Sequence, residues 1–177
     1  MLFRSIVQKF GGTSVGSIEK IRAVAERVLK ERQAGHRMIV VLSAMAGETD
    51  RLIGLARQMQ HIPDPRELDM LVSTGEQVSI ALFAMAVKDA GYDAVSLLGD
   101  QVAIHTDQMH TRARIDSIDA DRINRYLDRV QVPPDRTRRT SSRPSRRGMR
   151  TSVTTMSIRC LPRTSRASTP SEARWTR

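Results

Sequence analysis

The sequence contains a single cysteine, Cys160, and very few aromatic residues. One cysteine excludes an intrachain disulfide. The first ten residues lack the long apolar core of a signal peptide, and no uninterrupted apolar run approaches the roughly 20 residues that span a bilayer. These absences predict a soluble cytoplasmic protein with no membrane partner. The four histidines lack the spacing of metal ligands, so no metal site is expected.

The excess of positive over negative charge is confined to one end of the chain. The formal net charge is +10, and residues 133–177 account for all of it with 12 Lys+Arg against 2 Asp+Glu. Residues 1–132 are balanced, so the body of the chain gives no electrostatic reason to bind nucleic acid. A non-enzymatic binder that uses the basic tail remains an alternative, although Trp175 is the only aromatic residue there that could stack on a base.

The order of apolar segments predicts an α/β fold. The expected elements are a strand over residues 6–10, a helix over 18–28, a strand over 38–42, helices over 50–60 and 67–90, and a strand over 94–98. Ser17 is placed to cap the first helix, and Gly35 ends it. Met70 and Met85 are expected to fill the core. Strand, helix and strand in succession favour a parallel sheet.

A lysine followed by two glycines stands at the end of the first predicted strand. Gly11 and Gly12 let the backbone turn sharply and approach a ligand closely, and their N–H groups can cradle phosphate oxygens. Lys9 supplies a mobile positive charge for a transferring phosphoryl group. The lysine precedes the glycines, so this is not a Walker A loop. The spacing alone leaves a simple tight turn equally open.

Several strings of the sequence resemble those of one enzyme family. Residues 9–17 resemble the KFGGTSVGS signature of aspartate kinases, in the amino-acid kinase superfamily. The similarity continues in family order through residues 43–50, 66–69, 73–77 and 110–115. It covers about three-quarters of the chain. Chance similarity is a poor explanation for so many ordered matches.

The resemblance implies both a fold and a reaction. The fold is a three-layer αβα sandwich with a mainly parallel sheet. The reaction is ATP-dependent phosphorylation of the side-chain carboxylate of L-aspartate, with Mg²⁺ accompanying ATP, at the start of lysine, threonine and methionine biosynthesis. A homo-oligomer is also implied. Kinases of glutamate, acetylglutamate or carbamate remain the alternative within the superfamily.

The resemblance also assigns site residues. Lys9 contacts the phosphates and stabilises the transferring group. Thr49 and Glu76 match positions that hold aspartate, Glu76 by pairing with its ammonium group. The loop that binds the nucleotide phosphates comprises Lys9, Phe10, Gly11, Gly12, Thr13 and Ser14. Without the family, Thr49 could simply cap a helix and Glu76 could be a solvated helix residue.

The chain divides at residue 132. Residues 1–132 are expected to be the N-terminal part of an amino-acid kinase domain, and residues 133–177 a disordered, non-native tail. The family's GRGGSDTT and DVDGVYTTDPR segments and its regulatory ACT domains are not found there. Out-of-frame translation would explain this, because shifted codons can read Gly-Ser-Asp-Thr-Thr at 135–139 and Asp-Val-Asp at 156–158. The nucleotide sequence tests that hypothesis.

Such a tail would have two consequences. The arginine and aspartate of the family's GRGGSDTT segment would be missing, so negligible kinase activity is expected of the chain. Missing central strands would also leave an open sheet edge and poor solubility.

Overall fold

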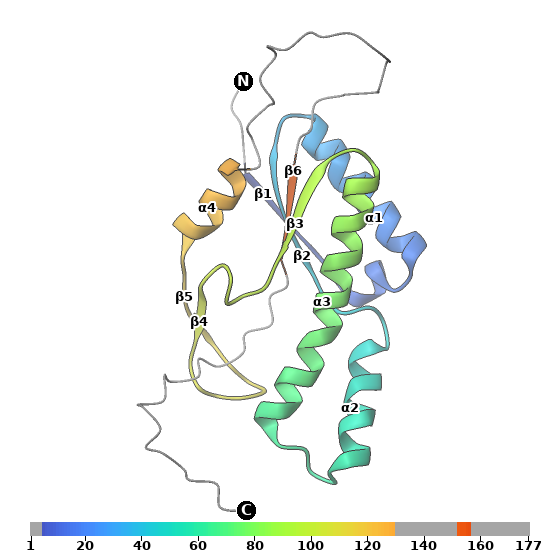
Figure 1. Cartoon of the computed structure of the whole chain (residues 1–177), viewed down its shortest axis with the longest axis vertical. Coiled ribbons are helices and arrows are strands. Elements are labelled where there is room, and N and C mark those ends of the chain that lie inside the picture. The colour runs from blue at the N-terminus through green and yellow to red at the C-terminus, as the bar shows by residue number, and fades with distance from the viewer. Residues whose placement is uncertain (1–4, 130–151, 157–177) are drawn as a thin grey trace, which may run out of the picture.

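The computed structural model describes residues 5–129 and 152–156, and its centre is a four-stranded parallel sheet (Figure 1). The strand order is β1-β2-β6-β3, and every neighbouring pair runs parallel. These strands are β1 (Ser5–Phe10), β2 (Arg37–Leu42), β3 (Asp93–Leu97) and β6 (Ser152–Met156). A separate antiparallel pair consists of β4 (Ile104–Thr106) and β5 (Ile115–Ile118).

Helices lie on both sides of this sheet. They are the 3₁₀ helix η1 (Gly12–Val15) and the α-helices α1 (Ile18–Gln33), α2 (Glu48–Met59), α3 (Pro65–Asp89) and α4 (Ala120–Arg129). Helices α1 and α3 lie together on one side, and α4 lies with the β4–β5 pair on the other (Figure 1). Helix α2 packs against α3. The predicted three-layer α/β architecture is therefore confirmed.

Strand β2 explains why both faces of the sheet are covered. Met38, Val40 and Leu42 point into a large apolar cluster with α1 and α3. Ile39 points to the opposite face, into a smaller cluster that includes Leu127 of α4. Alternate residues of a strand face opposite ways, so a strand between two layers must be apolar throughout.

Local signals set the helix starts. Ser17 caps α1 as predicted, because its Oγ accepts a hydrogen bond from the backbone N–H of Lys20 at 3.3 Å. Pro65 begins α3 two residues earlier than expected. Its missing N–H costs nothing at a first helical position, and Asp64 accepts hydrogen bonds from the next two amides.

Helix α3 is apolar on more than one face. Met70 and Met85 were expected in the core, but they are 50% and 63% exposed. The core face of the helix is already filled by other side chains, among them Phe83 and Val87. By length and composition α3 could also cross a membrane, contrary to the expectation that no segment would. Its packing against the sheet shows how a core helix meets the same criteria.

The tail differs from its expectation at one place. Residues Ser152–Met156 form β6, which lies between β2 and β3, with Val153 opposite Met38 on one side and Ala94 on the other. Valine and threonine are β-branched residues that favour strands. The position expected to be an open edge is thus occupied. The predicted disorder of the remaining tail lies outside the described residues.

Candidate active site

An exposed lysine near the end of β1 stands beside a loop with two consecutive glycines. Lys9 stands opposite Val41 in the sheet, one residue before β1 ends. Gly11 then leads into η1, where the N–H of Ser14 donates to its carbonyl at 2.9 Å. A Cβ added at Gly11 would lie 3.8 Å from Lys9 Nζ. The ammonium group of Lys9 therefore lies close to Gly11.

This loop packs closely against the segment that follows β2. A Cβ added at Gly12 would lie only 2.8 Å from the carbonyl oxygen of Ala44, so the backbones meet there without room for a side chain. A Cβ at Gly16 would lie 3.1 Å from Ala46 Cβ. The N–H of Ser43 also donates to the carbonyl of the last β1 residue at 3.1 Å. The two loops thus form one layer.

The segment that follows β2 also contacts α3. A Cβ added at Gly75 would lie 3.0 Å from Ala44 Cβ and 3.3 Å from Glu48 Cγ. Gly75 immediately precedes Glu76, the predicted aspartate ligand. Ala44 therefore contacts both the loop that follows β1 and the turn of α3 that carries Glu76. Three strings that are far apart in the sequence, at residues 9–17, 43–50 and 73–77, are brought together here.

Thr49 and Glu76 are both half-buried. Thr49 lies in the first turn of α2, but the cap of that helix is Gly47, whose φ of 80° is left-handed. The alternative that Thr49 caps the helix is therefore wrong. Glu76 lies in the middle of α3 and is not a fully solvated helix residue. Both positions are compatible with ligand contact.

An ion pair flanks this region at the start of α2. Arg51 donates two hydrogen bonds to Glu48, at 2.7 and 2.8 Å. This interaction lowers the pKa of Glu48 below its usual range and raises that of Arg51. Both groups therefore stay charged near neutral pH and largely neutralise each other. Arg51 is therefore engaged locally with Glu48.

Sequence reasoning missed several residues of this region. The Nζ of Lys20 donates to the carbonyl of Thr13 at 3.1 Å and brings a second cation to the β1 loop. Ala44 and Gly75 determine how closely the segments approach. Neither carries a functional group, so only their positions within recognised strings could have drawn attention to them.

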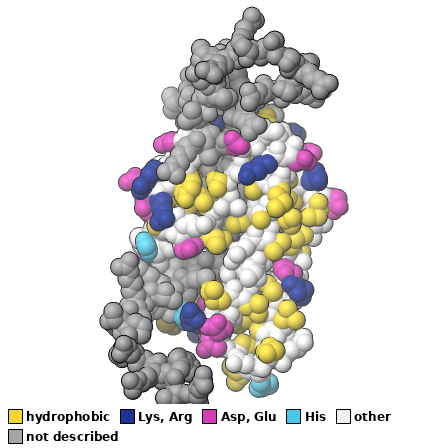
Figure 2. All heavy atoms as spheres, in the orientation of Figure 1, with side chains coloured by type: hydrophobic (Ala, Val, Ile, Leu, Met, Phe, Trp, Pro, Cys, Tyr) yellow, Lys and Arg dark blue, Asp and Glu magenta, His cyan; other side chains and the backbone are white. Residues whose placement is uncertain are grey.

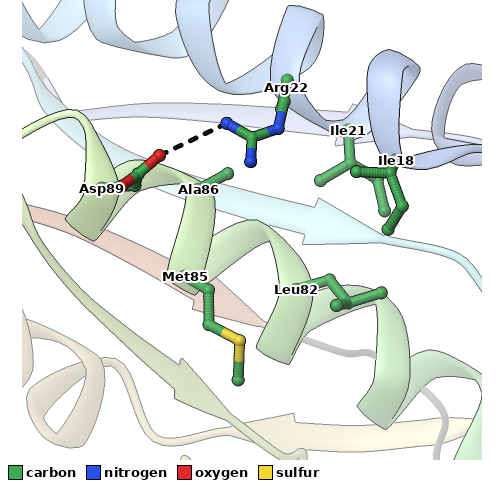
Figure 3. Close-up of a pocket in the computed structure, with 7 residues that line it drawn as sticks. All are labelled: Ile18, Ile21, Arg22, Leu82, Met85, Ala86 and Asp89. Atoms are coloured by element: carbon green, nitrogen blue, oxygen red, sulfur yellow. Dashed lines mark hydrogen bonds and ion pairs between the residues drawn. The ribbon is translucent and has the colours of Figure 1, made fainter.

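A groove among the described residues lies elsewhere. It has a volume of about 350 Å³ and runs between α1 and α3, where Ile21, Leu82 and Met85 give it an apolar lining (Figure 3). Arg22 and Asp89 form an ion pair of 3.3 Å at its rim. Hydrophobic side chains are also visible on the side of the molecule where α1 and α3 lie (Figure 2). None of Lys9, Thr49 and Glu76 lines this groove.

The described residues contain no cluster of metal-ligating side chains. Within residues 5–129 and 152–156, no three His, Cys, Asp or Glu side chains lie together as metal ligands.

A parallel sheet between helical layers, with a lysine and two glycines at the end of its first strand, defines the class. The chain belongs to the amino acid kinase family, whose pattern matches residues 4–134. The individual proteins to which it is similar are aspartate kinases. It is 62% identical over 127 residues to an aspartate kinase of Stutzerimonas stutzeri, and 59% identical over 123 residues to an aspartokinase of Geobacillus stearothermophilus.

Both alignments cover most of this chain but a minor part of the relatives. They include 72% and 70% of this chain, and 31% and 30% of those two proteins. The crystal structure of an aspartate kinase from Synechocystis is similar with a TM-score of 0.65 at 37% identity, over 88% of this chain and 21% of that one. The chain thus spans less than a third of the length of the curated relatives described here.

Proposed function

We propose that this chain carries the N-terminal part of an aspartate kinase site, in which ATP phosphorylates the side-chain carboxylate of L-aspartate to 4-phospho-L-aspartate. The observation that carries the proposal is the contact of three segments at Ala44, which joins the Lys9 loop to the turn of Glu76. A phosphate-binding loop and a carboxylate that can bind an amino acid are thereby neighbours. The identity to aspartate kinases supports the choice of substrate.

The β1 loop is proposed to hold the ATP phosphates. Phosphoryl transfer needs the transferring group to be positioned and its negative charge to be neutralised. Lys9 is proposed to supply the positive charge that neutralises the phosphate, and the backbone from Gly11 to Thr13 to supply N–H donors. The proximity of the Lys9 ammonium to Gly11, with Nζ 3.8 Å from a Cβ added there, supports this role. Mg²⁺ would arrive with ATP and would neutralise further charge on the phosphate oxygens.

The segment around Thr49 and Glu76 is proposed to hold aspartate. The nucleophile is the side-chain carboxylate of the substrate, which is already ionised at neutral pH. The enzyme therefore needs no general base, and its task is to bring two anions into line. Glu76 would pair with the substrate ammonium, and the Thr49 hydroxyl would hydrogen-bond a substrate oxygen.

The product is a mixed anhydride of a carboxylate and a phosphate, the activated intermediate from which lysine, threonine and methionine are made. We place this activity in the cytoplasm, in a homo-oligomeric enzyme. Glutamate- and carbamate-type kinases remain competing assignments, as does a nucleic-acid binder.

Calorimetric titration of the 177-residue chain with Mg·ATP and with L-aspartate tests the proposal. Lys9→Ala should weaken ATP binding by about tenfold or more, as expected for loss of a charge-assisted contact, and should affect aspartate less. Glu76→Gln should do the reverse. Lys88→Ala and Glu67→Gln, which change exposed charges on α3, serve as matched controls.

Competing ligands discriminate the alternatives. L-Glutamate and carbamate should bind more weakly than L-aspartate, and binding of duplex DNA should vanish as salt rises. If Lys9→Ala and Glu76→Gln both bind their ligands as the unaltered chain does, the assignment of the site is wrong.

A further inference from the structure

A buried carboxylate on α3 lies outside the roles assigned so far. Asp69 is only 3% exposed. It precedes Glu76 by seven residues, which is two helical turns, so both side chains leave the same face of α3 about 10 Å apart along its axis. A charge is seldom buried without partners that compensate its desolvation.

The partners of Asp69 come from the connection between β4 and β5. Its Oδ2 accepts a hydrogen bond from the backbone N–H of Thr111 at 2.8 Å, across 42 residues of sequence. The same oxygen lies 3.4 Å from Nδ1 of His110, an atom shielded from solvent. Two consecutive residues of one loop thus meet a single carboxylate of α3.

The backbone at this contact is in an uncommon conformation. Thr111 has a φ of 63°, in the left-handed region that β-branched residues rarely adopt. Such a conformation persists where surrounding contacts hold it in place. The hydrogen bond to Asp69 is formed by the amide of this same residue, so it stabilises the strained turn directly.

A second aspartate, Asp107, makes hydrogen bonds within the loop. Oδ1 of Asp107 accepts from the amides of Met109 at 3.2 Å and Arg114 at 3.1 Å, and its own amide donates to the Arg114 carbonyl at 3.0 Å. Asp107 therefore shapes the loop internally, whereas Asp69 joins it to α3. In Figure 1 the far end of the β4–β5 pair reaches toward the N-terminal half of α3.

We propose that Asp69 is a positioning residue that holds loop 107–114 against the face of α3 that carries Glu76, so that this loop forms an outer wall of the aspartate-binding region. The claim about the wall rests on the function proposed above. The claim about the contact does not, because it follows from the hydrogen bond and burial alone. Asp69 itself touches no substrate in this arrangement.

Limited proteolysis tests the contact, because the loop carries Arg112 and Arg114 as trypsin sites. Asp69→Ala should raise the rate of cleavage after these residues by about tenfold or more, since local opening controls access of the protease. Asp69→Asn retains an oxygen that can accept from Thr111 and should restore most of the protection. Glu67→Ala removes an exposed carboxylate from the same turn of α3 and should leave the rate unchanged.

Two results would overturn the contact. One is folded Asp69→Ala protein that is cleaved in the loop at the unaltered rate, and the other is an equal effect of Glu67→Ala. Should Asp69→Ala fail to fold, hydrogen exchange in the unaltered chain decides instead. The Thr111 amide should exchange at least about tenfold more slowly than an unstructured amide, and exchange at the unstructured rate would refute the proposal.

Ligand binding tests whether loop 107–114 forms a wall of the aspartate-binding region. L-Aspartate should slow cleavage of the loop in the unaltered chain, whereas Mg·ATP alone should not. Asp69→Ala should weaken aspartate binding several-fold with ATP binding unchanged, whereas Asp69→Asn, which retains the contact with Thr111, should bind aspartate nearly as the unaltered chain does. An unchanged aspartate affinity in a variant whose loop opens would refute the wall. If no aspartate binds but Asp69→Ala still exposes the loop, the proposed function fails and the contact stands.

Discussion

The two faces of the central sheet differ in how they are held together. The face covered by α1 and α3 has the larger apolar cluster, and it packs beside the end of β1 that carries Lys9 and the turn of α3 that carries Glu76. The opposite face, with α4 and the β4–β5 pair, has a smaller cluster around Ile39 and Leu127. Its loop is joined to α3 by a buried carboxylate instead. Apolar packing thus fixes one side of the site, and a specific polar contact positions the other.

The largest expected effect compares the cores of the two faces directly. Phe83→Ala removes a fully buried ring from the larger cluster and should lower the free energy of unfolding by about 3–5 kcal/mol. Leu127→Ala in the smaller cluster should cost about 2 kcal/mol, because its surroundings can relax more easily. Urea denaturation measures both. Equal costs would show that the faces are packed alike.

The next effect concerns the junction of loops on the first face. Gly12→Ala places a Cβ 2.8 Å from a backbone oxygen that cannot rotate away, and should destabilise by about 1–3 kcal/mol while weakening ATP binding. Gly54→Ala is the matched control, because its Cβ would meet nothing within 4 Å. In a helix that change should stabilise by up to about 1 kcal/mol. An unchanged free energy of unfolding in Gly12→Ala would show that the loops after β1 and β2 are not in close contact.

A smaller effect is expected at the start of α1. Ser17→Ala removes the cap and should cost about 1 kcal/mol. A hydrogen bond from Ser17 also lowers the pKa of Glu19, so this contribution is present above the unfolded pKa and is lost as pH falls through the folded one. Urea titrations at several pH values should therefore show the difference between the two proteins shrinking in acid. A difference that grows in acid would contradict this assignment.

The smallest effect lies at the groove between α1 and α3. Arg22 and Asp89 pair at 3.3 Å, but their side chains are 62% and 72% exposed. Solvent screens such a pair, so Arg22→Ala should change stability by no more than about 0.5 kcal/mol. Thermal denaturation at low and high salt checks this. A loss above 1 kcal/mol that disappears in salt would mean that the ion pair contributes to holding the first face together.

Prediction from sequence succeeded where the signals were local. Strand β1, the cap at Ser17 and helix α1 follow from short-range patterns, and the structure confirms them. The β4–β5 pair was missed, because strands of three and four residues are too short to show a period of two. Met85 was misplaced, because apolar spacing alone does not say which face of a long helix meets the core.

The sequence indicated which residues could form the candidate site, but not how they come together in space. Lys9, Thr49 and Glu76 stood out through resemblance to aspartate kinases, while Ala44 and Gly75 carry no chemistry that a motif would emphasise. The contact of Asp69 with Thr111 joins residues 42 positions apart. No periodicity encodes such a pairing.

The sequence by itself determined the α/β class, the first βαβ unit and the turn after β1, because hydrophobic period, caps and glycines act over a few residues. Only the tertiary structure decided that β6 enters between β2 and β3, that Ala44 joins two motifs, and that Asp69 is buried against the β4–β5 loop. Strand order and close contacts are settled by which distant surfaces exclude water together, and that depends on the packing of the whole chain.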